Sequence, residues 1–177
     1  MSRITEATVD GPGRGAADRG LSLLWTATSG ALVFHNLEEW WLGMTEWIAA
    51  RSWFPAHSLH GDQDEFAVVL AIVSGAVLML ALTAVFARPS WSSEVLVFVA
   101  YAMMVNGSSH AVLSLLSWSL MPGVITGSIV LLPLSAFVIR KLPPVRWTLA
   151  TVALLVITTV GVTAGALVLA SVLSGAQ

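Results

Sequence analysis

Long apolar stretches, separated by short polar segments, recur along most of the chain. Runs of about 20 apolar residues are typical of transmembrane helices, because a helix of that length crosses the hydrocarbon core of a bilayer. The pattern predicts an all-α, polytopic membrane helix bundle with about five transmembrane helices. We expect Pro133 to kink the fourth of them. The predicted spans cover residues 20–43, 65–87, 92–120, 123–139 and 147–173.

Three polar segments flank or separate these spans. Residues 1–18 are polar and glycine-rich, which predicts a flexible cytoplasmic tail and not a cleaved signal peptide. Residues 45–54 carry two tryptophans and Arg51, and they predict a short interfacial helix. Residues 57–65 contain two histidines and three acidic residues. We interpret this last segment as a solvated loop whose acids cap the next helix, in preference to a metal site.

Composition supports the membrane interpretation and narrows the function. Of the 177 residues, 56% are hydrophobic and 10% are charged, whereas about 25% are charged in a soluble domain. The mean hydropathy is +0.84. A net charge of −2 offers no basic face, so we expect no nucleic-acid partner. The absence of cysteine excludes disulfides, thiolate metal sites and thiol nucleophiles. Residues 19–177 are expected to form a single transmembrane domain.

The basic residues predict the orientation in the cell (inner) membrane. If the N-terminus is cytoplasmic, only Arg51 lies outside, and the other seven basic residues lie on the cytoplasmic side, as the positive-inside rule requires. With five spans, the C-terminus is then outside. The seven are Arg3, Arg14, Arg19, Arg88, Arg140, Lys141 and Arg146.

Ionisable residues occur inside two of the spans. His35, Glu38 and Glu39 lie one turn apart on the first span, and Asn106 and His110 form an i, i+4 pair on the third. Counted from the cytoplasmic end, His35 lies roughly 22 Å deep and His110 roughly 25 Å deep. Such groups cost roughly 2.5–3.5 kcal/mol each in a membrane. We therefore expect the two sets to face each other across one cavity.

Acid–base chemistry is the function that this combination favours. Two adjacent glutamates in a low dielectric should not both stay ionised, so one is expected to hold a proton. Glu38 or Glu39 would be the acid, His35 its relay, and His110 with Asn106 the opposing wall. No cofactor is required for this chemistry. The expected reaction is protonation-initiated isomerisation or cyclisation of an apolar, isoprenoid- or sterol-like substrate.

The motif around His35 resembles that of a known family. His35-Asn-Leu-Glu38-Glu39 is similar to the signature of the HXXEE family of prokaryotic integral membrane proteins. That family also carries a second histidine, which His110 matches, and a Tyr-x-Pro-Gly motif. Here Leu120-Met-Pro122-Gly123 matches the latter except that leucine replaces tyrosine. The family is named for its motif, so the resemblance implies a membrane fold but no particular activity.

Other interpretations of the polar residues stay open. His35, Glu38, Glu39 and His110 form a nitrogen and oxygen ligand set for zinc or iron, although only one helix supplies carboxylates. The same residues also suit a clasp between two helices. A membrane transport or assembly protein is the remaining alternative. The layout is similar to that of integral-membrane sterol isomerases and small membrane terpene cyclases, an analogy without a shared motif.

Partners follow from the membrane setting. We expect a lipophilic small-molecule substrate and membrane lipid as partners, and a homo-oligomer is an open option. The eight tryptophans lie near the ends of the predicted spans, which is typical of an aromatic belt. Trp41 and Trp118 are best placed to face the cavity as well. With Met103, which alternatively fills the core, they are the candidate substrate contacts.

Overall fold

The structure is a computed structural model, and it describes residues 12–53, 62–145, 147–149 and 152–153, with only the backbone for 12–17. The described part of the chain is helical and contains no strand. Its elements are α1 (Pro12–Trp41), α2 (Met44–Ala49), α3 (Gln63–Phe86), α4 (Ser92–Leu116), α5 (Val124–Thr126), the π-helical η1 (Gly127–Leu131) and α6 (Leu132–Lys141). The predicted all-α bundle is confirmed.

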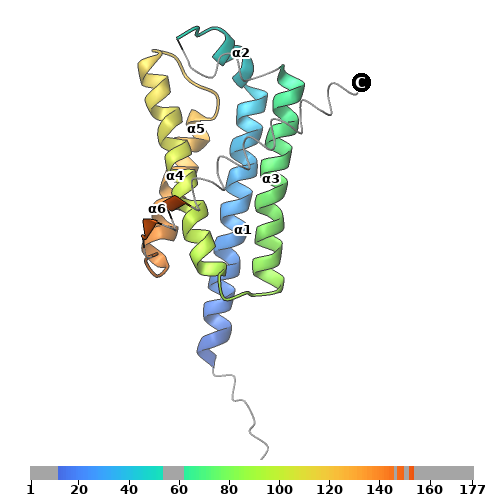
Figure 1. Ribbon diagram of the computed structural model, residues 1–177, viewed down its shortest axis with the longest axis vertical. Helices are drawn as coiled ribbons and strands as arrows, with labels where there is room; N and C mark the ends of the chain where they lie inside the picture. The colour runs from blue at the N-terminus through green and yellow to red at the C-terminus, as the bar shows by residue number, and fades with distance from the viewer. Residues whose placement is uncertain (1–11, 54–61, 146, 150–151, 154–177) are drawn as a thin grey trace, which may run out of the picture.

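The helices run alternately up and down along one long axis (Figure 1). α1 packs along α3, and α4 packs along the continuous segment formed by α5, η1 and α6. α1 also contacts η1 and α5, which joins the two pairs. The short α2 lies at the end of the bundle where α1 ends (Figure 1), as expected for an interfacial helix. Because of this alternation, the α3–α4 connection and the last turn of α6 lie toward the end opposite to α2.

Three helical segments of the described chain have the length and apolar character needed to cross a membrane. They are Gln63–Phe86, Ser92–Leu116 and Val124–Lys141, and they correspond to the predicted second, third and fourth spans. α1 is 30 residues long but is not one of the three, because its polar residues lower its mean hydropathy. The predicted fifth span lies outside the described residues except at 147–149 and 152–153.

One predicted boundary differs from the structure, and one predicted cap is found. α1 begins at Pro12, so residues 12–18 continue the helix instead of forming part of a flexible tail; residues 1–11 lie outside the described part. Most of the polar loop at 57–65 lies outside it as well. The Asp62 side chain at its end accepts hydrogen bonds from the backbone N–H groups of Asp64 and Glu65, at 3.0 and 2.9 Å. The loop therefore supplies the expected acidic cap of α3.

Side-chain size explains how the second helix pair packs. A Cβ on Gly107 in α4 would lie 2.8 Å from the carbonyl oxygen of Gly127 in η1, so this close approach requires glycine. The expected irregularity at Pro133 takes the form of a π-helical turn immediately before it. Proline lacks an N–H group and its ring crowds the carbonyl of Ile129, four residues earlier, so the regular α-helical bonding cannot continue.

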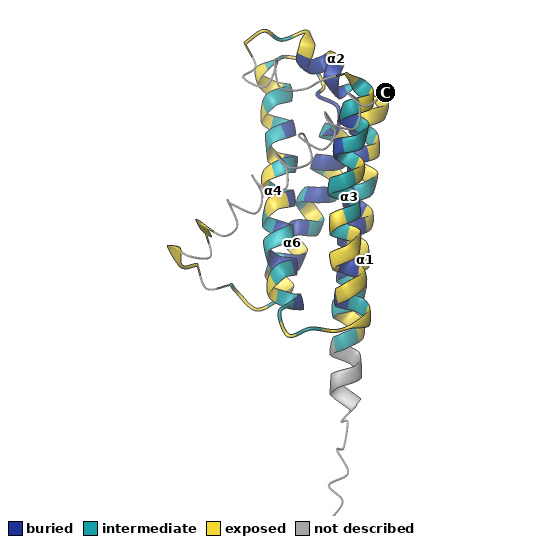
Figure 2. Cartoon of the chain, turned by 45° about the vertical axis from the view of Figure 1, so that its right-hand side comes forward, coloured by how far each residue is buried: buried dark blue, intermediate teal, exposed yellow. Residues whose placement is uncertain are grey.

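The interior is layered along the bundle axis. At the end away from α2, Trp25 is fully buried, and its indole N–H donates to the Ser92 hydroxyl at 2.8 Å. This corrects the assignment of Trp25 to the aromatic belt. Above this layer, Leu32, Met103 and Leu131 belong to an apolar cluster between α1, α4 and η1. Exposed residues lie on the outward faces of the helices, and buried residues lie on the faces turned toward the bundle axis (Figure 2).

Candidate functional site

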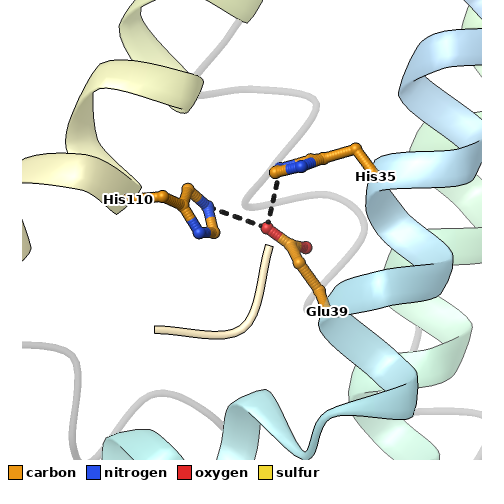
Figure 3. Close-up of side chains that lie close together, drawn as sticks. All are labelled: His35, Glu39 and His110. Carbon is orange, nitrogen blue, oxygen red and sulfur yellow. Dashed lines mark ion pairs between the residues drawn. The ribbon is translucent and has the colours of Figure 1, made fainter. Parts of the chain in front are cut away.

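His35 and Glu39 of α1 and His110 of α4 point toward one another inside the bundle (Figure 3). One carboxylate oxygen, Glu39 Oε1, lies 3.2 Å from His35 Nε2 and 2.9 Å from His110 Nε2. The two imidazole rings stand nearly perpendicular, at 76°, with their centroids 4.9 Å apart. We refer to these three residues as the triad. The predicted convergence of the first and third spans at this height is therefore found.

The triad is sealed from the surroundings of the bundle. His35 is 0% exposed, His110 3% and Glu39 6%. A carboxylate buried to this extent requires hydrogen-bond or charged partners, because the cost of removing it from water is otherwise large. Glu39 has two imidazoles as those partners. The arrangement is consequently a closely coupled unit and not three independent side chains.

The backbone fixes which nitrogen of His110 faces Glu39. His110 Nδ1 lies 2.7 Å from the carbonyl oxygen of Pro122. A carbonyl oxygen only accepts hydrogen bonds, so Nδ1 carries a hydrogen and donates it. Nε2 is then the atom that faces Glu39 Oε1 at 2.9 Å. A contact of this length between two acceptor atoms requires a proton between them, held either by His110 Nε2 or by Glu39.

His35 has a comparable set of partners. Its Nδ1 lies 2.9 Å from the Thr126 hydroxyl, which in turn reaches the Gly123 carbonyl at 3.5 Å. Its Nε2 lies 2.9 Å from the side-chain nitrogen of Asn106. Because an amide nitrogen donates, this network assigns the hydrogen of His35 to Nδ1 and leaves Nε2 as the acceptor. The Nε2 atoms of both histidines therefore face Glu39.

The two adjacent glutamates have different surroundings. Glu38 is half-buried and accepts backbone hydrogen bonds at the start of α5, from Ile125 N–H at 3.2 Å and Thr126 N–H at 2.8 Å. It is not part of the group of potential ligand atoms that Glu39 forms with the histidines, in which all atoms lie within 4.8 Å of one another. Of the four alternative metal ligands proposed from the sequence, three converge and Glu38 does not.

The Pro-Gly dipeptide of the expected motif borders the triad. Gly123 has a φ of +85°, a conformation that side chains with a Cβ rarely adopt. A Cβ at this position would also lie 2.8 Å from His110 Cε1 and 2.9 Å from Glu39 Cγ. Leu120, which replaces the family tyrosine, is exposed. Its side chain therefore does not take part in the buried site.

The three candidate substrate contacts do not join the triad. Trp41 is 80% exposed and Trp118 is 95% exposed, so both lie on the outside of the bundle and do not face the buried site. Met103 is buried, but it packs in the apolar layer with Leu32 and Leu131.

Sequence reasoning missed Thr126 and the Pro122 carbonyl. The Pro-Gly pair pointed toward the second of these, whereas nothing in the sequence distinguished Thr126.

Comparison with known proteins yields one family. The model of a family described as "Protein of unknown function with HXXEE motif" matches residues 27–138, and this region contains every residue of the site. Searches of curated proteins and of solved structures found no match. The matched region covers more than half of the chain and includes the His35-to-Glu39 motif from which the family takes its name. The chain therefore belongs to the HXXEE family.

Proposed function

We propose that this protein is an integral membrane enzyme that uses the triad for acid–base chemistry on an apolar, isoprenoid- or sterol-like substrate. The observation that supports it is the position of Glu39 Oε1 between two imidazole Nε2 atoms, at 3.2 and 2.9 Å. A buried carboxyl group that shares a proton with a histidine is a suitable general acid and, after losing that proton, a suitable base.

The proposed reaction moves one proton and changes no oxidation state. The proton held between Glu39 and His110 is transferred to one carbon of a C=C bond, so that a C–H bond forms and the π bond breaks. The resulting carbocation loses a proton from a neighbouring carbon, which completes an isomerisation, or is first attacked by a second double bond, which gives a ring. The lost proton returns to Glu39 or His110. His35 Nε2 faces the same Glu39 oxygen at 3.2 Å and can receive its proton.

The membrane setting supports a lipophilic substrate. Three helical segments are long and apolar enough to cross a membrane, and two of them carry His110 and Thr126, so a lipid-soluble molecule is the class of substrate that fits this setting. We also propose the cell membrane as the location and a cytoplasmic N-terminus. The last turn of α6 contains Arg140 and Lys141. Arg88 follows α3 and pairs with Asp18 near the start of α1 at 3.2 Å, so these basic residues gather at one end of the bundle.

A deuterium experiment tests the acid–base proposal directly. The full chain in lipid nanodiscs would be incubated in D₂O with squalene, geranylgeraniol and an unsaturated sterol, and deuterium in carbon-bound positions would be measured by mass spectrometry. We expect incorporation by the wild type and by the control Glu94→Gln, an exposed carboxylate on α4. Glu39→Gln should reduce the rate by about 10²-fold or more. Full activity of Glu39→Gln, or no incorporation into any probe, would contradict the proposal.

One observation favours a second candidate, a metal-dependent membrane enzyme. His110 Nδ1 donates to a backbone carbonyl and His35 Nδ1 to a hydroxyl, which is how metal-binding histidines are usually held. Two Nε2 atoms and one carboxylate within 4.8 Å match a zinc site with three protein ligands. His35, Glu39 and His110 would hold zinc or iron, which would supply Lewis acidity.

Elemental analysis separates the two candidates. Under the metal proposal, the purified wild type and Glu94→Gln should both contain about one metal ion per chain. His110→Gln should lose it, because removing a residue that binds the metal directly weakens binding more than the roughly 10–100-fold loss caused by removing a ligand's hydrogen-bond partner. Under the acid–base proposal, His110→Gln lowers deuterium incorporation while the metal content of all three proteins stays the same.

A further inference from the structure

Glu38 caps a helix that does not contain it. Gly123, the N-cap residue of α5, provides no side-chain hydrogen bond, and the N–H groups in the first turn of a helix have no partner within that helix. The Val124 and Gly127 N–H groups donate to the backbone carbonyls of Met121 and Gly123. The Ile125 and Thr126 N–H groups donate instead to the Glu38 carboxylate. Glu38 thus ties the start of α5 to α1.

This cap has a direct connection to the triad. Thr126 N–H donates to Glu38 Oε2 at 2.8 Å, and the hydroxyl of the same residue lies 2.9 Å from His35 Nδ1. Glu38 and His35 are one turn apart on α1, so the contacts run from α1 to Thr126 and back to α1. The place of the Thr126 hydroxyl relative to His35 therefore depends on the Glu38 carboxylate.

We infer that Glu38 is a positioning residue that fixes the tautomer of His35 through Thr126. The Thr126 hydroxyl accepts from Nδ1 of His35, which keeps Nε2 free to face Glu39 and Asn106. Without Glu38, Thr126 is held less firmly, and the Asn106 amide nitrogen at Nε2 is then the main contact that favours the His35 hydrogen on Nδ1. The tautomer of His35 can be measured without any substrate. Only the role of this tautomer in catalysis rests on the proposed function.

The arrangement explains why the cap comes from another helix. An N-cap is usually Ser, Thr, Asp or Asn, because these side chains accept a hydrogen bond from the first turn. Position 123 cannot carry such a side chain, since a Cβ there would lie 2.8 Å from His110 Cε1. A carboxylate from α1 satisfies both free N–H groups instead. Glutamine is a poor substitute, because its amide offers one accepting oxygen and turns an NH₂ group toward the second N–H.

Nuclear magnetic resonance of histidine nitrogens tests the inference. The full chain would be labelled with ¹⁵N-histidine and held in lipid nanodiscs. The nitrogen signals of His35 and His110 would be assigned by their loss in His35→Gln and His110→Gln. In the wild type and in Glu94→Gln we expect His35 to carry its hydrogen on Nδ1. In Glu38→Gln and Thr126→Val, the ratio of the Nδ1–H to the Nε2–H form should fall about fivefold, the size of one net hydrogen bond. Thr126→Ser should restore the wild-type ratio.

The control within the site is His110. Its Nδ1 donates to the Pro122 carbonyl and not to Thr126, so its signals should change little in the same variants. If Glu38→Gln does not fold, Glu38→Asp, which shortens the reach by one methylene, should give the same shift at His35. An unchanged His35 ratio in a folded Glu38 variant would overturn the inference, even if Thr126→Val changes it. Failure of the deuterium experiment alone would leave this result intact.

Discussion

Replacing Gly123 by alanine should destabilise the protein and displace the triad. The residue has a φ of +85°, and placing a residue with a Cβ in the left-handed region costs about 1–2 kcal/mol. The added Cβ would lie 2.8 Å from His110 Cε1 and 2.9 Å from Glu39 Cγ. Forcing an extra methyl group into a packed interior costs about 1–3 kcal/mol more. We therefore expect a loss of about 2–5 kcal/mol in the free energy of unfolding.

The measurement is reversible unfolding of the full chain in mixed micelles with increasing SDS, followed by far-ultraviolet circular dichroism. Gly75→Ala is the matched control, because Gly75 lies within α3 and a Cβ there would meet nothing within 4 Å. This control should be neutral or up to about 1 kcal/mol more stable, since alanine is the better helix former. Equal stability of the two variants would refute the close approach of Gly123 to His110 and Glu39.

Two further predictions address topology and the far end of the bundle. A reporter at the N-terminus, or in the segment 140–146, should locate to the cytoplasm and one at the C-terminus to the outside; the opposite result at either terminus would remove one span from the predicted five. Trp25→Phe should lower the free energy of unfolding by about 0.5–1.5 kcal/mol through loss of its hydrogen bond to Ser92. In a Ser92→Ala background, Trp25→Phe should cost less free energy of unfolding. Equal losses in the wild-type and Ser92→Ala backgrounds would argue against the hydrogen bond between Trp25 and Ser92.

The sequence predicted the meeting of the first and third spans because helical geometry is fixed. A rise of 1.5 Å per residue places His35 and His110 at matching heights once the span ends are known. The structure brings their Nε2 atoms to the same oxygen of Glu39. Height alone carries no information about rotation, however. Glu38 and Glu39 are about 100° apart around α1, so the height alone could not show which of the two the rotation of α1 turns toward His110.

Residues whose surroundings come from distant parts of the chain could not be placed from the sequence. Trp25 lies near the end of a predicted span, which suits an aromatic belt, but Ser92 provides a partner for its indole N–H and allows full burial. Trp118 has a φ of 50° and lies outside the bundle, because the turn after α4 rotates it away. Thr126 and Ser128 are two hydroxyl residues in the same largely apolar segment, and nothing in the sequence indicates that Thr126 is the one that contacts His35.

The spacing of the family motif follows from the two contacts that its glutamates make. Glu39, four residues after His35, lies on the same face of α1 and places its carboxylate at His35 Nε2, 3.2 Å away. Glu38, three residues after His35, turns toward α5 and binds the N–H group of the residue whose hydroxyl contacts His35 Nδ1. One glutamate thus engages each nitrogen of the same imidazole, directly at Nε2 and through Thr126 at Nδ1. Interchanging the two roles would need a different rotation of α1, so in this chain the order His35-x-x-Glu38-Glu39 is tied to the rotation of the helix.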